Sequence, residues 1–449
     1  MADIALAPPA RTFFGEPRAL GYLAFTEAWE RFSYYGMTSL LVLYMSQALF
    51  LPGHIEHIAG FTAFRGALES VFGRMSTLAL ASQVFGLYTS LVYFTPIFGG
   101  LIADRLIGRR RAVMAGAILM SGGHIAMAFD GSFLLALALL VTGCGLLKGN
   151  ISTQVGQLYP EDDAAGRSRG FSIFSMGINV GAVTGPLVCG FLGIRYGWHW
   201  GFGLAGVLML LGLATYLAGY RLLTETSIRH PEARKEALTG AQLRVIAGLF
   251  AVMALTIFQS AAFYQNSNMG LIWVQQRVDL DVLGFHVPPP WFIAVDSFTS
   301  IIAVPLLFVL WRWQGTRGGA PGELAKIATG AFITVAANLM LALGSLFGGQ
   351  VSALFPVLYE VLLGIGFLYY WPTLLALVSR TAPPSIKATL MGCVFLTLSI
   401  SNMVIGRLGA LYEHMSPAAF WTMEAAIAAV GAVLALLLRR PLERLLETS

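Results

Sequence analysis

Residues 99–113 read GGLIADRLIGRRRAV. An apolar run ends here at Asp104, a loop with four arginines comes next, and another apolar run begins at once. Alternation of apolar runs and short basic loops is typical of membrane-spanning helices, because each crossing needs roughly 20 apolar residues and Lys and Arg collect in the loops on one side. The stretch therefore predicts membrane helices on both sides of this loop.

The composition agrees with a membrane protein. Of 449 residues, 57% are hydrophobic and only 11% are charged, whereas soluble proteins carry about 25% charged residues. The net charge of +5 is spread over alternate loops and forms no basic patch, so it does not indicate a nucleic-acid partner. We expect an all-α polytopic protein whose main partner is the lipid bilayer.

Twelve apolar segments are long enough to span the membrane. An even number places both termini on the same side. The predicted spans are 20–48, 79–106, 112–130, 133–157, 171–194, 199–220, 243–272, 290–312, 325–347, 351–378, 386–411 and 418–438.

The basic residues predict the orientation. The N-terminus and every second loop hold 21 of the 28 Lys and Arg, including Arg11, Arg229, Arg234 and Lys235. Positive residues stay on the cytoplasmic side, so both termini are expected to be cytoplasmic and the protein to lie in the cytoplasmic (inner) membrane.

One long polar segment divides the chain. It predicts an N-terminal six-helix bundle at 1–220, a cytoplasmic linker at 221–240 and a C-terminal six-helix bundle at 241–449. Two such bundles around a site at the membrane midplane are typical of major facilitator transporters, and residues 99–113 resemble the loop motif of that superfamily. The resemblance implies that Asp104, Arg105 and Arg109 join neighbouring helix ends and separate as the carrier changes state; arginines that only set topology are the alternative.

Three charges lie inside the first predicted span. On a helix, Glu27, Arg31, Tyr34 and Thr38 share one face, while Glu30 lies to its side. One arginine can neutralise one acid, which leaves the other acid unpaired. Each charge costs roughly 2.5–3.5 kcal/mol at the membrane centre, so we interpret Glu27, Glu30 and Arg31 as a proton site; a purely structural pair is the alternative.

Other charges also fall within spans. Lys148 has no acid nearby in sequence, and we expect it to bind an anion, although a lysine that extends to the membrane surface would look similar. Asp296 and Glu360 begin their spans and face either a site or outer water. Arg407 and Glu424 lie at similar depth and are expected to form a structural pair.

Four stretches resemble the proton-dependent oligopeptide transporter (POT) family of the major facilitator superfamily. EAWERFSYYGM at 27–37 matches the family's Glu-x-x-Glu-Arg-Phe-x-Tyr-Tyr motif. The others are GLYTSLVYFTPIFGGLIADRLIG, LLKGNISTQVGQLYPEDD and FSIFSMGINVGAVTG, which begin at residues 86, 146 and 171.

This resemblance implies symport of di- and tripeptides with protons by alternating access, without a cofactor. It assigns proton coupling to Glu27, Glu30 and Arg31. The substrate-binding residues that it implies, or that we add from the charges above, are Arg31, Tyr34, Tyr35, Tyr93, Lys148, Asn179, Asp296 and Glu360.

The chain departs from the family at several positions. Thr38 replaces a usual arginine, Tyr264 replaces an acid, and Phe367 replaces the glutamate that would bind the peptide ammonium. We expect Asp296 or Glu360 to take over that contact. Alternatives are a family member that carries nitrate or a small organic acid, and a slow or arrested carrier. The cluster HIEH at 54–57 lacks a convincing third ligand, so neither a metal site nor an enzyme is expected; the sequence does not indicate an oligomeric state.

Overall fold

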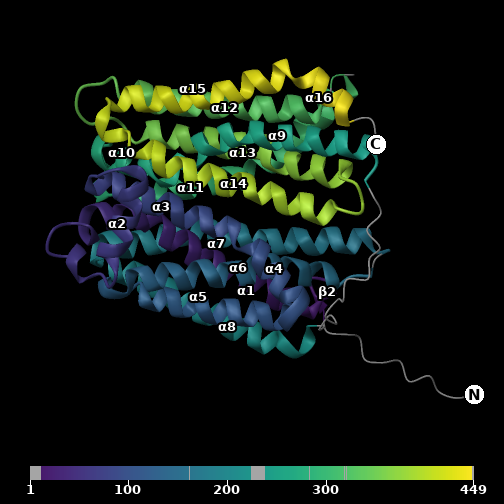
Figure 1. Cartoon of the computed structure of the whole chain (residues 1–449), viewed down its shortest axis with the longest axis horizontal. Coiled ribbons are helices and arrows are strands. Elements are labelled where there is room, and N and C mark those ends of the chain that lie inside the picture. Colours follow the sequence, from purple (N-terminus) through teal and green to yellow (C-terminus); the bar gives the residue numbers. More distant parts are fainter. Residues whose placement is uncertain are drawn as a thin grey trace, which may run out of the picture.

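The computed structural model describes residues 12–160, 162–223, 238–282, 284–317, 319 and 321–446. Long helices lie side by side across the molecule, with the first half of the chain below the second half in the view of Figure 1. The helices of the first half are α1 (Arg18–Tyr44), α2 (Phe61–Phe72), α3 (Thr77–Phe94), α4 (Pro96–Ile102), α5 (Arg109–Ala126), α6 (Phe133–Gln157), α7 (Ala164–Tyr196) and α8 (Trp198–Gly219).

The second half repeats this pattern of long helices. Its helices are α9 (Gly240–Tyr264), α10 (Met269–Arg277), α11 (Pro290–Thr316), α12 (Glu323–Gly344), α13 (Leu354–Thr381), α14 (Lys387–Gly409), α15 (Pro417–Leu437) and α16 (Arg439–Leu446). Two antiparallel hairpins complete the described elements, with strands β1 (Thr12–Phe13), β2 (Glu16–Pro17), β3 (Asp281–Val282) and β4 (Phe285–His286).

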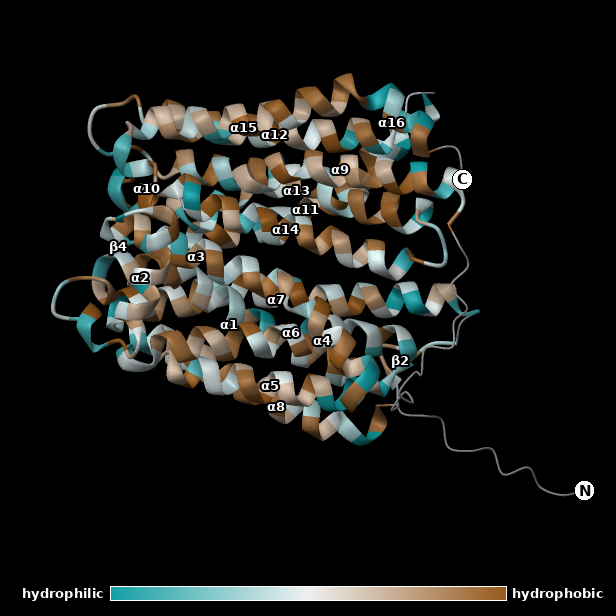
Figure 2. Cartoon of the chain, viewed as in Figure 1, coloured by the Kyte–Doolittle hydropathy of each residue, from teal (hydrophilic) through white to brown (hydrophobic). Residues whose placement is uncertain are grey.

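Every predicted span contains a long helix, although two spans are broken. In the described part of the chain, ten helical stretches are long and apolar enough to cross a membrane. The remaining two predicted spans are α1 and α5. Glu27, Glu30 and Arg31 lower the hydropathy of α1, and α5 begins with three arginines. Figure 2 shows apolar residues along the middle of the helices and hydrophilic residues at both ends, as expected of an all-α membrane protein with the major facilitator fold.

Helices of each half pack mainly on one another. In the first half α1 lies against α7 and α8, and in the second half α12 lies against α13 and α15. The halves meet through α3 with α14 and through α7 with α11. Most of the predicted linker, residues 224–237, lies outside the described residues, as do Arg11, Arg229, Arg234 and Lys235. The division at residues 221–240 therefore stays a prediction.

The first and last described elements lie at one end of the molecule. β2 and α16 are both at the right of Figure 1, whereas α2 and α10 are at the left. Glu16 in β2 accepts a charge-assisted hydrogen bond from Arg169 Nε at 2.6 Å, which ties the first hairpin to the start of α7. We call this end the terminal end and the other the α2 end.

Two predicted spans are broken helices. The predicted span 79–106 is interrupted at Thr95, where Pro96 begins α4 and its missing N–H suits a helix start. The predicted span 243–272 ends as a helix at Tyr264, and the polar residues Gln265–Asn268 follow before α10 begins. Asn and Ser side chains can form hydrogen bonds with the backbone in place of helical ones. The apolar residues on either side nevertheless made the whole stretch resemble one continuous helix.

Candidate functional site

A row of glycines on α7 holds the charged turn of α1 in place. A Cβ atom at Gly181 would lie 2.5 Å from the carbonyl oxygen of Ala28 and 2.7 Å from Cβ of Arg31. Gly177 and Gly185 approach the α1 backbone as closely, at Ala24 and Phe32. Small residues four apart let membrane helices pack backbone to backbone, so this row determines where the α1 charges lie.

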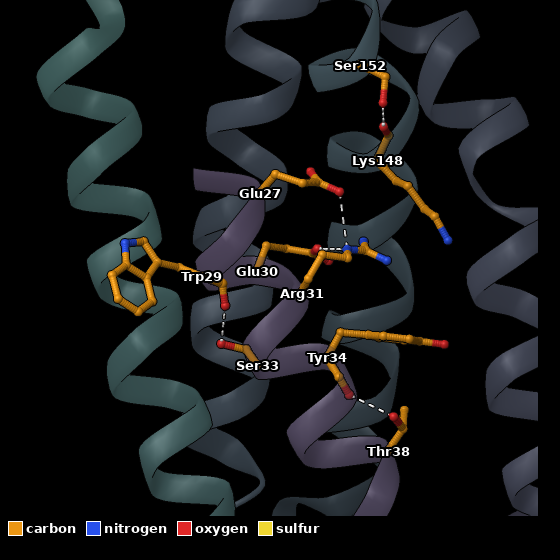
Figure 3. Close-up of polar contacts among 9 residues, drawn as sticks. All are labelled: Glu27, Trp29, Glu30, Arg31, Ser33, Tyr34, Thr38, Lys148 and Ser152. Atoms are coloured by element: carbon orange, nitrogen blue, oxygen red, sulfur yellow. Dashed lines mark hydrogen bonds and ion pairs between the residues drawn. The ribbon is translucent and has the colours of Figure 1, made fainter. Parts of the chain in front are cut away.

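Both acids of α1 contact the same nitrogen of Arg31 (Figure 3). Arg31 Nε lies 3.2 Å from Glu27 Oε1 and donates a short hydrogen bond to Glu30 Oε2. One oxygen of each acid and Arg31 Nη2 are buried without a hydrogen-bond partner. One guanidinium cannot neutralise two buried carboxylates, so a proton on one acid would complete the cluster, while Nη2 of Arg31 stays free to donate to another group.

A cavity of about 930 Å³ lies between the two halves of the chain. Helices α1, α3, α4, α6 and α7 line it on one side, and the α9 region, α11, α13 and α14 line it on the other. The predicted site residues that line it are Glu27, Arg31, Tyr34, Tyr35, Tyr93, Lys148, Asn179 and Asp296.

Four α1 residues share the cavity face, as their spacing predicted. Glu27, Arg31, Tyr34 and Thr38 all line the cavity, while Glu30 is fully buried behind them. Thr38 Oγ1 donates to the carbonyl oxygen of Tyr34 at 2.9 Å, within its own helix (Figure 3). Thr38 therefore supplies no cross-helix contact of the kind an arginine could make.

Lys148 presents an unpaired cation to the cavity. Its Nζ lies 4.2 Å from the ring centroid of Tyr93, and no ion pair of Lys148 is found among the residues that the structure describes. In Figure 3 its side chain extends toward the same side of α1 as Arg31. An anion bound between the two would meet one free ammonium and the free Nη2 of Arg31.

The second half contributes a different wall. Asp296 on α11 is its one acid on the cavity, in the described part of the chain. Ser297 Oγ donates to Asp296 Oδ1 at 2.7 Å. The same half also lines the cavity with the rings of Phe263, Phe367, Trp371 and Phe395, of which the sequence analysis singled out only Phe367. Aromatic residues are frequent in membrane helices, so only their position identifies them.

Glu360 does not line the cavity. It is buried on α13 and accepts a hydrogen bond from Asn266 Nδ2 at 3.3 Å, and Asn266 is the residue on the cavity surface. Ser267 Oγ donates to Asn266 Oδ1 at 3.0 Å and also lines the cavity. Neither residue was predicted, although the run QNSN inside an apolar span was the available signal.

The predicted Arg407–Glu424 pair is wrong. Glu424 is fully buried on α15 and accepts from Gln265 Nε2 at 2.9 Å. Arg407 instead donates to the Phe72 carbonyl oxygen at 3.4 Å and is exposed. Similar depth did not place the two residues on facing sides of their helices. An amide donor without charge satisfies one oxygen of Glu424, and the other has no partner.

The predicted gating residues lie away from the cavity. Arg109 Nη2 is 2.9 Å from Asp104 Oδ1, which joins the end of α4 to the start of α5. Arg105 is exposed in the same turn. None of these three residues lines the cavity, so they can change the cavity only by moving the helices that carry them.

The two halves touch at the α2 end of the molecule. A Cβ atom at Gly86 on α3 would lie 2.6–2.7 Å from the α14 backbone at Asn402 and Gly406. Ser82 Oγ donates to the Gly406 carbonyl oxygen at 3.0 Å, and Trp291 Nε1 donates to that of Leu187 at 2.8 Å.

The cavity reaches toward the other end. Its lining includes Thr153 near the end of α6 and Gly392 near the start of α14, both toward the terminal end. Within the cavity, the hydroxyls of Tyr93 and Tyr264 lie 3.5 Å apart across the two halves. The conformation is therefore closed at the α2 end.

Comparison with known proteins agrees with this geometry. The sequence profile of the POT family matches residues 110–238 and 227–422. The chain is 29% identical to the di-/tripeptide transporter of Lactococcus lactis subsp. cremoris, covering 97% of this chain and 98% of the relative. It is 28% identical to the peptide transporter YePEPT of Yersinia enterocolitica, covering 98% of each, and 29% identical to the uncharacterised transporter YclF of Bacillus subtilis, covering 92% of each.

Solved structures are similar over nearly the whole chain. The peptide transporter POT in complex with sulfate superposes with a TM-score of 0.86 at 28% identity, covering 98% of each chain. A POT family transporter in complex with 5-aminolevulinic acid gives a TM-score of 0.83 at 25% identity, covering 97% of this chain and 98% of the other. With a profile match over most of its length and the same helix arrangement, this membrane protein belongs to the POT family.

Proposed function

We propose that the protein is a proton-coupled symporter of di- and tripeptides that works by alternating access and is not an enzyme. The observation that carries the proposal is the cavity between the halves, where the free Lys148 and the shared Arg31 face Asp296 across the space. A zwitterionic peptide has the complementary charges at its two ends. Relatives that are named as di-/tripeptide transporters support the same substrate class.

The charges suggest how a peptide would bind. Its carboxylate would lie between Lys148 Nζ and Arg31 Nη2, which has no partner in this state. Its ammonium would contact Asp296, the acid on the opposite wall. Tyr34, Tyr35 and the residues near them would pack on the peptide with apolar ring faces and polar hydroxyls, which tolerates varied side chains.

Proton coupling would follow from the α1 cluster. A peptide carboxylate that draws Arg31 toward itself leaves Glu27 or Glu30 without its cation. A buried carboxylate without a partner is unfavourable, so a proton would bind as the peptide does. The bound peptide and the proton would therefore favour each other, which is the requirement for symport.

We further propose the cytoplasmic (inner) membrane as the location, with both termini cytoplasmic. The excess of Lys and Arg in the loops at the terminal end supports this orientation. The conformation closed at the α2 end would then be the inward-facing one. Separation of Arg109 from Asp104 would accompany the change to the outward-facing state, and alanine at either residue should shift that equilibrium.

Uptake into proteoliposomes tests the function. Labelled dialanine should accumulate when an inward proton gradient is imposed, and unlabelled trialanine should block it. Glu27→Gln and Glu30→Gln should each abolish gradient-driven uptake and spare dialanine exchange without a gradient. Normal gradient-driven uptake by both variants would contradict a proton role for this cluster.

The ammonium contact has its own test. Asp296→Asn should weaken dialanine binding by at least tenfold, while Glu360→Gln should change it little because Glu360 lies behind Asn266. The two amide variants are matched in chemistry and differ only in access to the cavity. Unchanged dialanine affinity in Asp296→Asn would exclude it as the ammonium ligand.

A second candidate is a carrier of a non-peptide anion, such as nitrate or a small organic acid. The unpaired Lys148 favours it, because any anion would suit that ammonium. Competition of nitrate and acetate against dialanine separates the two functions: anions that compete at equal strength would favour the second. A folded protein that binds dialanine but does not transport it would indicate an arrested carrier.

A further inference from the structure

Four rings form one surface of the cavity, which we call the aromatic wall: Phe263, Phe367, Trp371 and Phe395. Phe367 lies at the centre. Its ring centroid is 5.4 Å from that of Phe263 and 6.4 Å from that of Trp371, with interplanar angles of 31° and 24°. Trp371 contacts Phe395 edge to face at 5.7 Å. The wall thus joins α9, α13 and α14 into one apolar surface.

These rings are not simply core packing. Phe367, Trp371 and Phe395 are only partly buried, and all four rings line the cavity. Trp421 and Tyr359, which contact each other edge to face in this half, are almost completely buried and do not line the cavity. Aromatic surface that faces a cavity beside placed charged groups is typical of a ligand site.

We propose that the aromatic wall binds the side chain of the peptide's N-terminal residue and makes the carrier prefer an apolar or aromatic residue there. This inference rests on the proposed peptide function.

The ends of the peptide determine which side chain reaches the wall. With its carboxylate at Arg31 and Lys148, the C-terminal residue lies against the first half of the chain. With its ammonium at Asp296 on α11, the N-terminal residue lies against the second half, where α13 packs on α11. A Cβ atom at Gly364 on α13 would lie 2.5 Å from the Asp296 carbonyl oxygen, so the backbones are in contact at this level.

The wall begins one turn beyond that contact. Phe367 is three residues after Gly364, toward the terminal end, and Trp371 is one turn further. A side chain next to the ammonium would therefore lie over these two rings. Offset or edge-to-face contact between aromatic rings adds to the gain from burial, whereas a lysine or glutamate side chain would lose water without gaining a charged partner.

Competition binding with four dipeptides tests the inference. Phe-Ala should bind the wild-type protein about tenfold more tightly than Ala-Ala, from burial of one aromatic side chain. Ala-Phe should gain much less, and Lys-Ala should not gain. In Trp371→Leu and Phe367→Leu the Phe-Ala advantage should fall to about twofold, and Trp371→Phe should keep most of it.

Trp313→Leu is the matched control. Trp313 is a half-exposed tryptophan on α11 that does not line the cavity, so its loss should leave the Phe-Ala to Ala-Ala ratio unchanged. Thermal unfolding of each variant checks that it is folded. A wild-type ratio near one, an equal gain for Ala-Phe, or a ratio retained in both Leu variants would overturn this inference alone. No binding of either dipeptide would overturn the proposed function as well.

Discussion

The two walls of the cavity use different chemistry. The first half of the chain presents Glu27 and Arg31, which pair within one turn of α1, and the unpaired Lys148. The second half presents rings and a single acid, Asp296, to the cavity and keeps Glu360 and Glu424 buried with amide partners. The first wall therefore depends on charge neutralisation and the second on shape, and the two should respond to different substitutions.

Removal of Arg31 should have the largest effect. Arg31→Ala leaves Glu27 and Glu30 buried without a cation, which typically costs about 3–5 kcal/mol. We expect a strong decrease in the thermal unfolding temperature together with loss of dialanine uptake. The triple variant Glu27→Gln, Glu30→Gln, Arg31→Met should recover most of the stability but not the uptake. If the triple variant were as unstable as Arg31→Ala, loss of packing would explain the effect instead of charge.

Lys148 should separate binding from stability. It has no ion pair among the described residues, so Lys148→Met should leave the unfolding temperature nearly unchanged. A hydrogen bond to a charged group contributes roughly 1.5–3 kcal/mol, and dialanine affinity should fall about 10- to 100-fold. Isothermal titration with dialanine measures this. A large decrease in stability with normal affinity would show that Lys148 is structural.

Behind the second wall, the sensitive group is the buried amide of Gln265. Gln265→Leu removes the donor to Glu424 and should lower the free energy of unfolding by about 1–3 kcal/mol. Combined with Glu424→Leu, which removes the acceptor, part of this loss should disappear; the rest belongs to the contacts of Gln265 with Ile405 and Asn268. The double-mutant cycle is measured by denaturant unfolding in detergent. Additive losses would mean that the hydrogen bond contributes nothing.

The contact between the walls should matter least. Tyr93 and Tyr264 meet at 3.5 Å, at the limit of a hydrogen bond. Tyr93→Phe should therefore change stability by less than about 0.5 kcal/mol while it keeps the ring beneath Lys148. Tyr93→Leu removes that ring and should affect dialanine affinity more. Equal effects of the two variants would assign the role to the hydroxyl.

Most of the fold and half of the site followed from the sequence. The twelve spans were readable because apolar length is a local property, and the shared face of Glu27, Arg31 and Tyr34 follows from helical periodicity alone. The partner of Glu424 could not be predicted from the sequence, because the depth of a residue in the membrane does not determine which neighbouring helix its side chain contacts. The aromatic wall was missed for the same reason: Trp371 and Trp421 look alike in sequence, yet one lines the cavity and the other is core.

The break in the helix at Gln265–Asn268 could not be predicted from the sequence, because apolar residues lie on both sides of it. The apolar pattern predicts one helix through these four polar residues. In the structure, Gln265 and Asn268 contact α14, whereas Asn266 and Ser267 line the cavity. Irregular backbone at membrane depth is found where it lines a cavity or is buried in protein, which makes such a run a useful signal for a site.

The closure at the α2 end joins the halves without ion pairs between described residues. Glycine contacts, a serine pair at Ser90 and Ser399, and the hydroxyl of Ser82 hold α3 against α14. Dissolved salt screens interactions between charges, but it has little effect on backbones in van der Waals contact. The opening of this end should thus depend less on ionic strength than on side-chain volume, and a single methyl group added at Gly86 should keep α3 and α14 from closing there.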